Sequence, residues 1–479
     1  MVAKEKIKNR EAILSTANNQ RWEVGENFHD TLMESIYSNA SAIAKRSVTL
    51  PAQKETINWE KTLDKILTSR YLGFPIMFLI LGVVFWLTIE GANVPSAMIA
   101  SFFLDTIHPI LKSLSASIGL PFWADGVLID GAYLAMAWVI SVMLPPMAIF
   151  FPLFTLLEDF GYLPRVSFNM DGLYRKVGAH GKQALTMAMG FGCNAAGIVA
   201  TRVIDSPREK LIAIITNNFS LCNGRWPTQI LIAVIFIGAA VPAYLAGIVS
   251  ALAVVFIAVL GIVFSLLVSW GLSKSVLKGE ASAFSLELPP YRPPRILQTL
   301  YTSLIDRTIF VLWRAIIFAI PAGVVIWLVG NITIGGETIA NIFIDWSNPF
   351  AFILGLNGVI LLAYIIAIPA NEIVIPTILM LTVMSLGLSG VGEGAGVMFE
   401  LDSIAATEEI LVAGGWTLLT GINLMLFSLL HNPCSTTIYT IFKETKSVKW
   451  TLVSTFLPIL MGIIVTFFVA QIWRLIASI

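Results

Sequence analysis

Long apolar runs recur along this chain of 479 residues and restrict its fold more than any other feature. The runs cover residues 72–90, 130–157, 183–201, 211–238, 245–272, 308–330, 350–388, 413–442 and 450–475. A helix of about 20 apolar residues can cross the hydrocarbon core of a bilayer. Charged residues make up only 13% of the chain, whereas a soluble domain carries about 25%. We therefore expect an all-α polytopic transmembrane bundle with eight to ten crossings.

Basic residues are concentrated in particular segments between the runs. The basic segments are 1–70, 158–182, 273–307 and 443–449. Segments poor in basic residues are 91–129, 331–349 and 390–412. Because Lys and Arg are enriched in cytoplasmic loops, we expect the first group inside and the second outside. The chain would then be a multi-pass protein of the cell inner (cytoplasmic) membrane with its N-terminus in the cytoplasm.

Two of the runs do not fit single crossings. Both ends of 183–201 adjoin basic segments, which predicts a re-entrant hairpin. The run 350–388 is too long for one span, and we expect it to turn back around Pro369 and Asn371. Each run follows a span interrupted by proline, and such a weak repeat is typical of transporters with a site between two halves.

These features predict four parts of the chain, two of which are gate-like membrane repeats. The parts are a cytoplasmic linker with an amphipathic helix at Trp59–Ser69 (1–70), a first membrane repeat (71–272), a cytoplasmic loop (273–307) and a second membrane repeat (308–479).

Glycine, proline, asparagine and cysteine interrupt four apolar segments. The breaks are Gly190–Asn194, Asn217–Pro227, Pro369–Pro376 and His431–Thr437. Unpaired backbone groups are costly in lipid, so a broken helix is tolerated only where it faces protein or water. All three cysteines of the chain lie in these breaks. We interpret the breaks as the lining of one polar site, although each cysteine alone could be a small buried packing residue.

Thiol, amide and carboxylate groups together are typical of a site for a divalent transition metal rather than Mg²⁺ or Ca²⁺. Half-helix ends inside a membrane add oriented carbonyls that suit a cation. The candidate metal ligands are Cys193, Cys434, Cys222, Asn194, Asn371, Glu372 and His431. Candidate gate or exit residues are Glu158, Asp159 and Asn217. Glu158 and Asp159 could instead form a salt bridge with Arg165, and His431 could be a structural histidine.

Four stretches of the chain resemble the membrane domain of the ferrous iron transport protein B family. They are Leu156–Arg165, Gly190–Arg202, Pro369–Val374, and His431–Thr437 with Lys443–Thr445. The likeness runs in family order from about Trp59 to the C-terminus. It implies two gate-like repeats, import of Fe²⁺, and pore-associated roles for Cys193 and Cys434.

Members of this family usually begin with a cytoplasmic GTPase domain. Residues 1–70 are too short for one, and the chain lacks the Gly-x-x-x-x-Gly-Lys-Ser/Thr loop that cradles phosphates. We therefore expect a transporter rather than an enzyme, with Fe²⁺ as the transported ion and no tightly bound cofactor. The expected partners are the lipid bilayer and, as further candidates, a separate GTPase protein, a small accessory protein and a second copy of the chain. The net charge of zero gives no reason to expect nucleic acid as a partner.

Other functions remain compatible with the sequence. The cargo could be Mn²⁺, Zn²⁺ or a nucleoside-like solute, since amides also bind organic molecules. The chain could also be a non-transporting membrane partner of a separate GTPase. An intramembrane enzyme is not expected, because neither an HExxH pair nor a GxSxG elbow occurs.

Overall fold

The computed structural model describes residues 28–47, 59–69, 71–278, 290–291, 295–388, 401 and 403–477. The chain separates into two compact units. The smaller comprises Met1–Leu63 and Ser282–Glu287, and the larger comprises Asp64–Ala281 and Leu288–Ile479. Most of the expected N-terminal linker and most of the acidic segment 390–412 lie outside the described residues.

The smaller unit contains α2 (Phe28–Ser47). The amphipathic helix expected at Trp59–Ser69 is α3 (Trp59–Leu67), which contains the boundary between the units. The end of α3 belongs to the larger unit, where the side chain of Asn169 donates a hydrogen bond of 2.7 Å to the carbonyl of Leu67.

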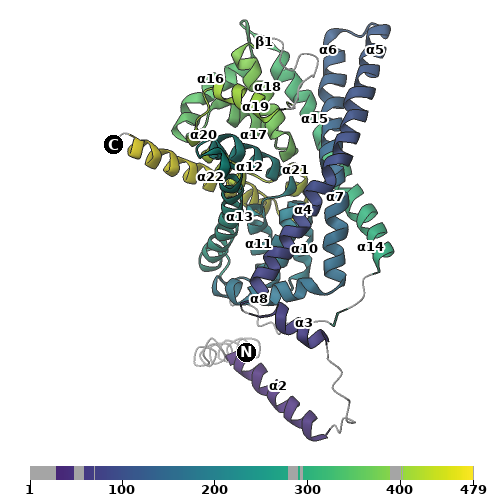
Figure 1. The fold of residues 1–479 in the computed structure, drawn as a ribbon, viewed down its shortest axis with the longest axis vertical. Coiled ribbons are helices and arrows are strands. Elements are labelled where there is room, and N and C mark those ends of the chain that lie inside the picture. The colour runs from purple at the N-terminus through teal and green to yellow at the C-terminus, as the bar shows by residue number, and fades with distance from the viewer. Residues whose placement is uncertain are drawn as a thin grey trace, which may run out of the picture. The chain divides into compact units, whose positions relative to one another are not determined.

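Five long apolar helices form the framework of the larger unit (Figure 1). They are Gly73–Ile118 (α4 Gly73–Ala100, η1 Ser101–Ile107, α5 His108–Ile118), Phe122–Asp159 (α6 Phe122–Asp125, η2 Gly126–Tyr133, α7 Leu134–Asp159), α13 (Ala243–Lys274), Ile296–Asn331 (α14 Ile296–Thr302, η7 Ser303–Ile309, α15 Phe310–Asn331) and α22 (Val448–Ala477). The chain is therefore a polytopic transmembrane helical bundle, as the apolar runs predict. The segment 273–307, expected as a loop, contains the start of the fourth of these helices.

The described residues give fewer complete spans than the eight to ten expected. Five helices are long and apolar enough to cross a membrane, and seven result if each of two bent pairs counts as one span. The sequence-based count is higher because it includes the runs 183–201 and 211–238. In the structure these runs are divided into helices of 11, 7, 10 and 7 residues and short 3-10 and π-helical turns, and none of the four helices is long enough to span.

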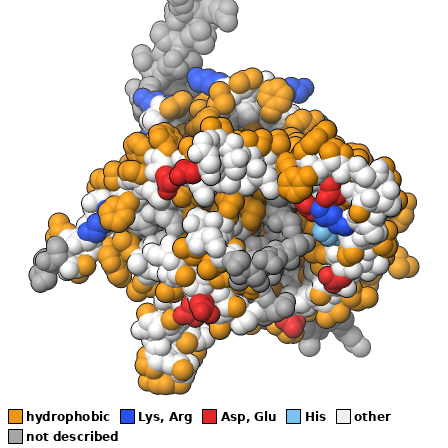
Figure 2. All heavy atoms as spheres, turned by 90° about the horizontal axis from the view of Figure 1, so that it is seen from above, with side chains coloured by type: hydrophobic (Ala, Val, Ile, Leu, Met, Phe, Trp, Pro, Cys, Tyr) orange, Lys and Arg blue, Asp and Glu red, His pale blue; other side chains and the backbone are white. Residues whose placement is uncertain are grey.

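The first two long helices pack side by side as an antiparallel hairpin (Figure 1). Gly119 turns the chain between them with φ +71°, a left-handed conformation that favours glycine. Near this end, Lys112 Nζ lies 2.6 Å from a carboxylate oxygen of Asp125 and 2.5 Å from one of Asp130. Figure 2, which shows the molecule from above, has small groups of charged side chains within a largely hydrophobic surface.

In the first half, a short hairpin precedes a broken helix. After α8 (Tyr162–Lys176), α9 (Lys182–Gly192) and α10 (Asn194–Ala200) pack against each other. Lys182 Nζ donates to the carbonyl of Val203, 2.8 Å away, so the two ends of this hairpin lie together as a re-entrant segment requires. The broken helix follows as α11 (Pro207–Thr216), η4 (Asn217–Phe219), η5 (Asn223–Arg225), α12 (Trp226–Ile232) and η6 (Ala233–Gly238).

The second half has the same order of elements. A two-residue turn joins β1 (Thr333–Ile334) to β2 (Glu337–Thr338), and α16 (Ile339–Ile353) meets α17 (Gly358–Ile366) at 110°. The hairpin consists of α17, η8 (Asn371–Ile373) and α18 (Val374–Leu386). The broken helix consists of α19 (Ile404–Ala413), α20 (Leu418–Leu430) and α21 (Ser435–Thr445). A long helix closes each series, α13 in the first half and α22 in the second.

Candidate functional site

Hydrogen bonds between breaks join the two halves at the centre of the larger unit. Asn371, at the break of the second hairpin, donates its Nδ2 to Sγ of Cys222 over 3.7 Å. His431 Nε2, at the break after α20, lies 3.0 Å from Oδ1 of the same asparagine. The amide of Asn371 therefore connects the first broken helix with the second.

The other two thiols and Glu372 belong to the same region. Cys434 lies immediately before α21, with its Sγ 3.2 Å from the Thr437 hydroxyl. Cys193 lies between α9 and α10, at the break of the first hairpin, and Glu372 follows Asn371 in η8. A Cβ at Gly224 would lie 2.4 Å from Glu372 Oε1, so this carboxylate rests against the backbone of the first broken helix.

Asn194 and Asn217 hold the first hairpin together. Asn217 Nδ2 donates to the carbonyl of Asn194 over 3.0 Å. A Cβ at Gly190 or Gly197 would lie 2.6 or 2.5 Å from Asn217 Oδ1, so these glycines leave room for the amide between the two arms. With its nitrogen facing the carbonyls, Asn194 donates to Gly190, 2.9 Å away, and to Ser220, 3.3 Å away. Both side chains thus bond the backbone around the break at Cys193.

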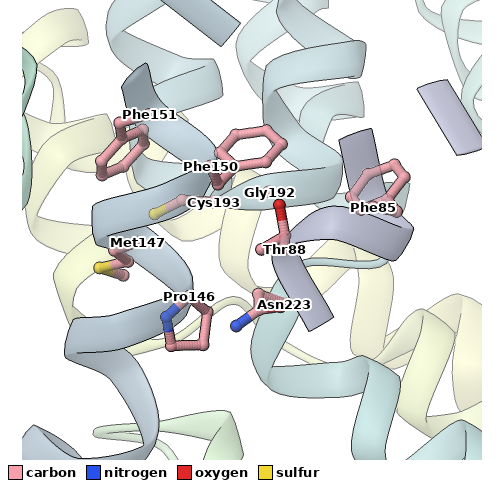
Figure 3. Close-up of a pocket in the computed structure, with 9 residues that line it drawn as sticks. All are labelled: Phe85, Thr88, Pro146, Met147, Phe150, Phe151, Gly192, Cys193 and Asn223. Carbon is pink, nitrogen blue, oxygen red and sulfur yellow. The ribbon is translucent and has the colours of Figure 1, made fainter. Parts of the chain in front are cut away.

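A cavity of about 10 Å³ lies beside Cys193 (Figure 3). Its lining comes from α4, α7, the first hairpin and the first broken helix, and consists of Phe85, Thr88, Pro146, Met147, Phe150, Phe151, Gly192, Cys193 and Asn223. A water molecule needs roughly 10–15 Å³ of such space. In this conformation the cavity is therefore no larger than a single water molecule.

The three thiols are not arranged as a preformed metal cluster. Across the part of the chain that the structure describes, no three His, Cys, Asp or Glu side chains are placed to hold a metal ion together. An ion at this place would therefore need amide or carbonyl oxygens as additional ligands. The breaks supply both kinds of oxygen.

Arg225 was not among the candidate ligands of the sequence, yet it lies within the same region. Its side chain is 1% exposed and donates to backbone carbonyls of both halves. The signal that could have found it is a permanent charge inside an apolar run, which is rare and often functional.

The acidic pair Glu158 and Asp159 lies away from the thiols. Asp159 follows Phe151, which lines the cavity beside Cys193, by eight residues of the same helix, roughly 12 Å. Its carboxylate accepts a 2.6 Å hydrogen bond from Thr299. The salt bridge considered between Arg165 and this pair is not formed.

Arg165 instead binds Asp64, at the end of α3. The distance from Arg165 Nε to Asp64 Oδ1 is 3.0 Å, and the hydroxyl of Tyr291 donates to the same oxygen over 2.7 Å. Partial burial raises the pKa of Asp64. The hydrogen bonds from Arg165 and Tyr291 together lower it by more than burial raises it, so the pKa lies below the usual 3.8.

Comparisons with known proteins agree with this architecture. Residues 140–236 match the Gate family, described as nucleoside recognition, and residues 254–306 match the ferrous iron transport protein B C terminus. A curated Fe(2+) transporter FeoB from Staphylococcus aureus is 30% identical over 86% of this chain and 59% of its own length. The same-named protein from Synechocystis is 30% identical over 85% of this chain and 62% of its own length.

The chain thus spans about 59% of the length of the first of these relatives. A FeoB from Campylobacter jejuni is 26% identical over 84% of this chain and 63% of its own length. A solved structure of CNTnw in an outward-facing state aligns with 85% of this chain and 98% of its own, at 14% identity and a TM-score of 0.31, a likeness too distant to support an argument. The two domain matches and the similarity to the FeoB relatives over most of the chain support a membrane domain of the FeoB family in this chain.

Proposed function

We propose that this chain conducts Fe²⁺ across the membrane through the region where its helix breaks meet. The observation that carries the proposal is that Asn371 contacts both Cys222 of the first half and His431 of the second, which brings the thiol-bearing breaks and Glu372 together. Thiols, a carboxylate and amide oxygens form a donor set that suits a borderline divalent metal. The curated relatives are named Fe(2+) transporters, which supports the same cargo here.

At the Cys193 thiol, the small cavity favours an ion over an organic solute; a second, largely apolar cavity of about 580 Å³ lies beside Tyr364 and Asn432. About 10 Å³ beside Cys193 is far too small for a nucleoside, although the Gate family is described by nucleoside recognition. Few ligands of moderate strength would suffice, because an ion bound too tightly would not leave the pore.

The finer features of the proposal follow from the charge pattern and the element order. The repeats would be residues 71–272 and 308–479, in the inner membrane, with the N-terminus in the cytoplasm. Fe²⁺ would pass between ligands at Cys193, Asn194, Cys222, Asn371, Glu372, His431 and Cys434, with Glu158, Asp159 and Asn217 at a gate or exit. A separate GTPase protein and a small accessory protein are proposed partners.

Uptake by the purified chain in proteoliposomes tests this function. We expect Fe²⁺ to quench an enclosed metal-sensitive dye, and the Cys193→Ser, Cys434→Ser double variant to be slower by at least about tenfold. Ser113→Ala, in α5 near the turn between the first two long helices, is the control and should transport like the wild type. The melting temperatures of all variants show whether a loss of uptake reflects unfolding.

The remaining outcomes separate the competing functions. Equal uptake by the wild type and the double variant would argue against ligation by the thiols of Cys193 and Cys434. Preferential uptake of Mn²⁺, Zn²⁺ or a labelled nucleoside would change the cargo. The absence of flux for every solute would support a non-transporting membrane partner of a GTPase.

A further inference from the structure

Arg225 places a permanent positive charge between the two broken helices. Arg225 is 1% exposed, its backbone N–H donates to the carbonyl of Cys222, and Glu372 lies against the neighbouring Gly224. A guanidinium remains charged even where it is buried, so this position is cationic in every protonation state of its neighbours.

Four backbone carbonyls surround the charged group. Arg225 Nη1 donates to Asn218 over 3.0 Å and to Leu429 over 3.1 Å. Nη2 donates to His431 over 3.4 Å and to Asn432 over 3.3 Å. One of these oxygens belongs to the first half of the chain and three belong to the second.

The three oxygens of the second half lie where α20 ends at Leu430. The last carbonyls of a helix lack partners within the helix, and its C-terminus carries about half a negative charge. Carbonyls at the ends of half-helices in a membrane are the groups that bind small monovalent cations in transporters. Removal of the guanidinium would leave these four oxygens (the carbonyl cage) without its N–H donors, and Na⁺ and K⁺ are ions that such carbonyls bind.

We propose that Arg225 is a tethered cation that occupies this carbonyl cage and so determines which cations the central region accepts. A monovalent ion cannot bind the cage while the guanidinium fills it. The guanidinium also lies near Cys222 and Glu372 and repels any cation there. Only a cation that the thiol and the carboxylate bind strongly would therefore be held beside it. Arg225 is thus a specificity-determining residue rather than a metal ligand.

A purely structural role makes a different prediction. Arg225 could act only as a clamp whose hydrogen bonds join the two halves. Any side chain at position 225 that donates hydrogen bonds to these carbonyls would then keep the two halves together, whatever its charge. Gln and Lys distinguish these roles, because the Gln amide has two donors and no charge, whereas the Lys ammonium has three donors and a full charge.

The test measures the melting temperature of the full chain in detergent with Arg225→Gln, Arg225→Lys or Arg225→Met. Each protein is compared in KCl, NaCl and choline chloride at equal ionic strength. We expect K⁺ or Na⁺ to raise the melting temperature of the Gln and Met variants by about 2 °C or more over choline. The wild type and the Lys variant should not distinguish the salts.

Arg474 supplies a matched control. Its guanidinium also donates to a carbonyl near a helix end, that of Phe352, but the bond is exposed. Arg474→Gln should therefore gain no stability specific to K⁺ or Na⁺. If the Gln and Met variants melt alike in all three salts, or cannot be recovered folded in K⁺ or Na⁺ any better than in choline, the cage is not a cation site and the proposal is wrong. This readout needs no Fe²⁺ flux, so its failure is distinguishable from failure of the proposed function.

Discussion

The side-chain nitrogen of Asn371 lies 3.7 Å from Sγ of Cys222, although 149 residues separate the two in the sequence. One residue belongs to the hairpin of the second half and the other to the broken helix of the first. The same amide approaches His431 from its oxygen side. The polar centre is therefore assembled by both halves, and neither half contains it alone.

Loss of the Asn371 amide should affect stability and transport together. Asn371→Ala would leave His431, which is 2% exposed, without its partner on Nε2. Such an unsatisfied buried group costs about 1–3 kcal/mol, and we expect a lower melting temperature and slower Fe²⁺ uptake. Asn331→Ala is the control, because its amide only donates to Trp327 at the end of α15. Similar losses in both variants would contradict a special role of Asn371.

Gly224→Ala should displace the carboxylate of Glu372. The new Cβ would lie 2.4 Å from Oε1 of that side chain, which can move because it is the end of a flexible group. We expect reduced Fe²⁺ uptake with little change in melting temperature. Gly271→Ala in α13 meets nothing within 4 Å, so it should leave uptake unchanged and stabilise by up to about 1 kcal/mol. Normal uptake by Gly224→Ala would show that the position of Glu372 is unimportant.

The carboxylate of Glu444, near the end of α21, forms ion pairs with two basic side chains of the first half. Arg202 Nη2 is 2.5 Å from its carboxylate and Lys210 Nζ is 3.3 Å away. A double-mutant cycle of Arg202→Gln and Glu444→Gln should give a coupling energy of about 0.5–1 kcal/mol, because the Arg202 side chain is 59% exposed. The Arg175–Asp171 pair within α8 is the comparison, and its coupling should be about 0.3–0.5 kcal/mol. A coupling near zero for Arg202 and Glu444 would mean that this contact does not stabilise the association of α21 with the turn that follows α10.

Because Asp64 is ionised in its pair with Arg165, we expect the stability of the fold to depend on pH. The pKa of Asp64 lies below 3.8 in the folded protein, so the ionised form stabilises the fold at pH values above the unfolded pKa. This contribution to stability is lost as the pH falls through the pKa that Asp64 has in the folded protein. The difference in melting temperature between the wild type and Asp64→Asn should therefore be constant from pH 7 to 5 and shrink below about pH 4. A difference that grows on acidification would contradict the assigned interaction with Arg165 and Tyr291.

The positions of the helix breaks could be predicted from local sequence, because glycine, proline and asparagine act on the backbone around them. Gly190–Asn194 and His431–Thr437 both fall at interruptions in the structure. The hairpin between β1 and β2 was not predicted. Its signal was the Gly335–Gly336 pair, whose φ values of +65° and +96° are those of a tight two-residue turn.

The pairing of the breaks could not be predicted, because it depends on contacts between residues far apart in the chain. No local pattern indicates that the guanidinium of Arg225 reaches Leu429 or that Asn371 reaches Cys222. The extent of the first helix was also missed. Residues 91–129 have the composition of an external segment, but the π-helical turn η1 continues the helix into α5 despite Pro109.

The hairpin formed by the first two long helices cannot lie upright within a flat bilayer. Its first arm has 46 residues and, at 1.5 Å per residue, is about 69 Å long, more than twice the hydrocarbon thickness of about 30 Å. The arm must therefore project beyond the lipid tails at one or both ends or tilt steeply along the membrane. A reporter dye attached near Gly119 would distinguish an aqueous from an interfacial environment.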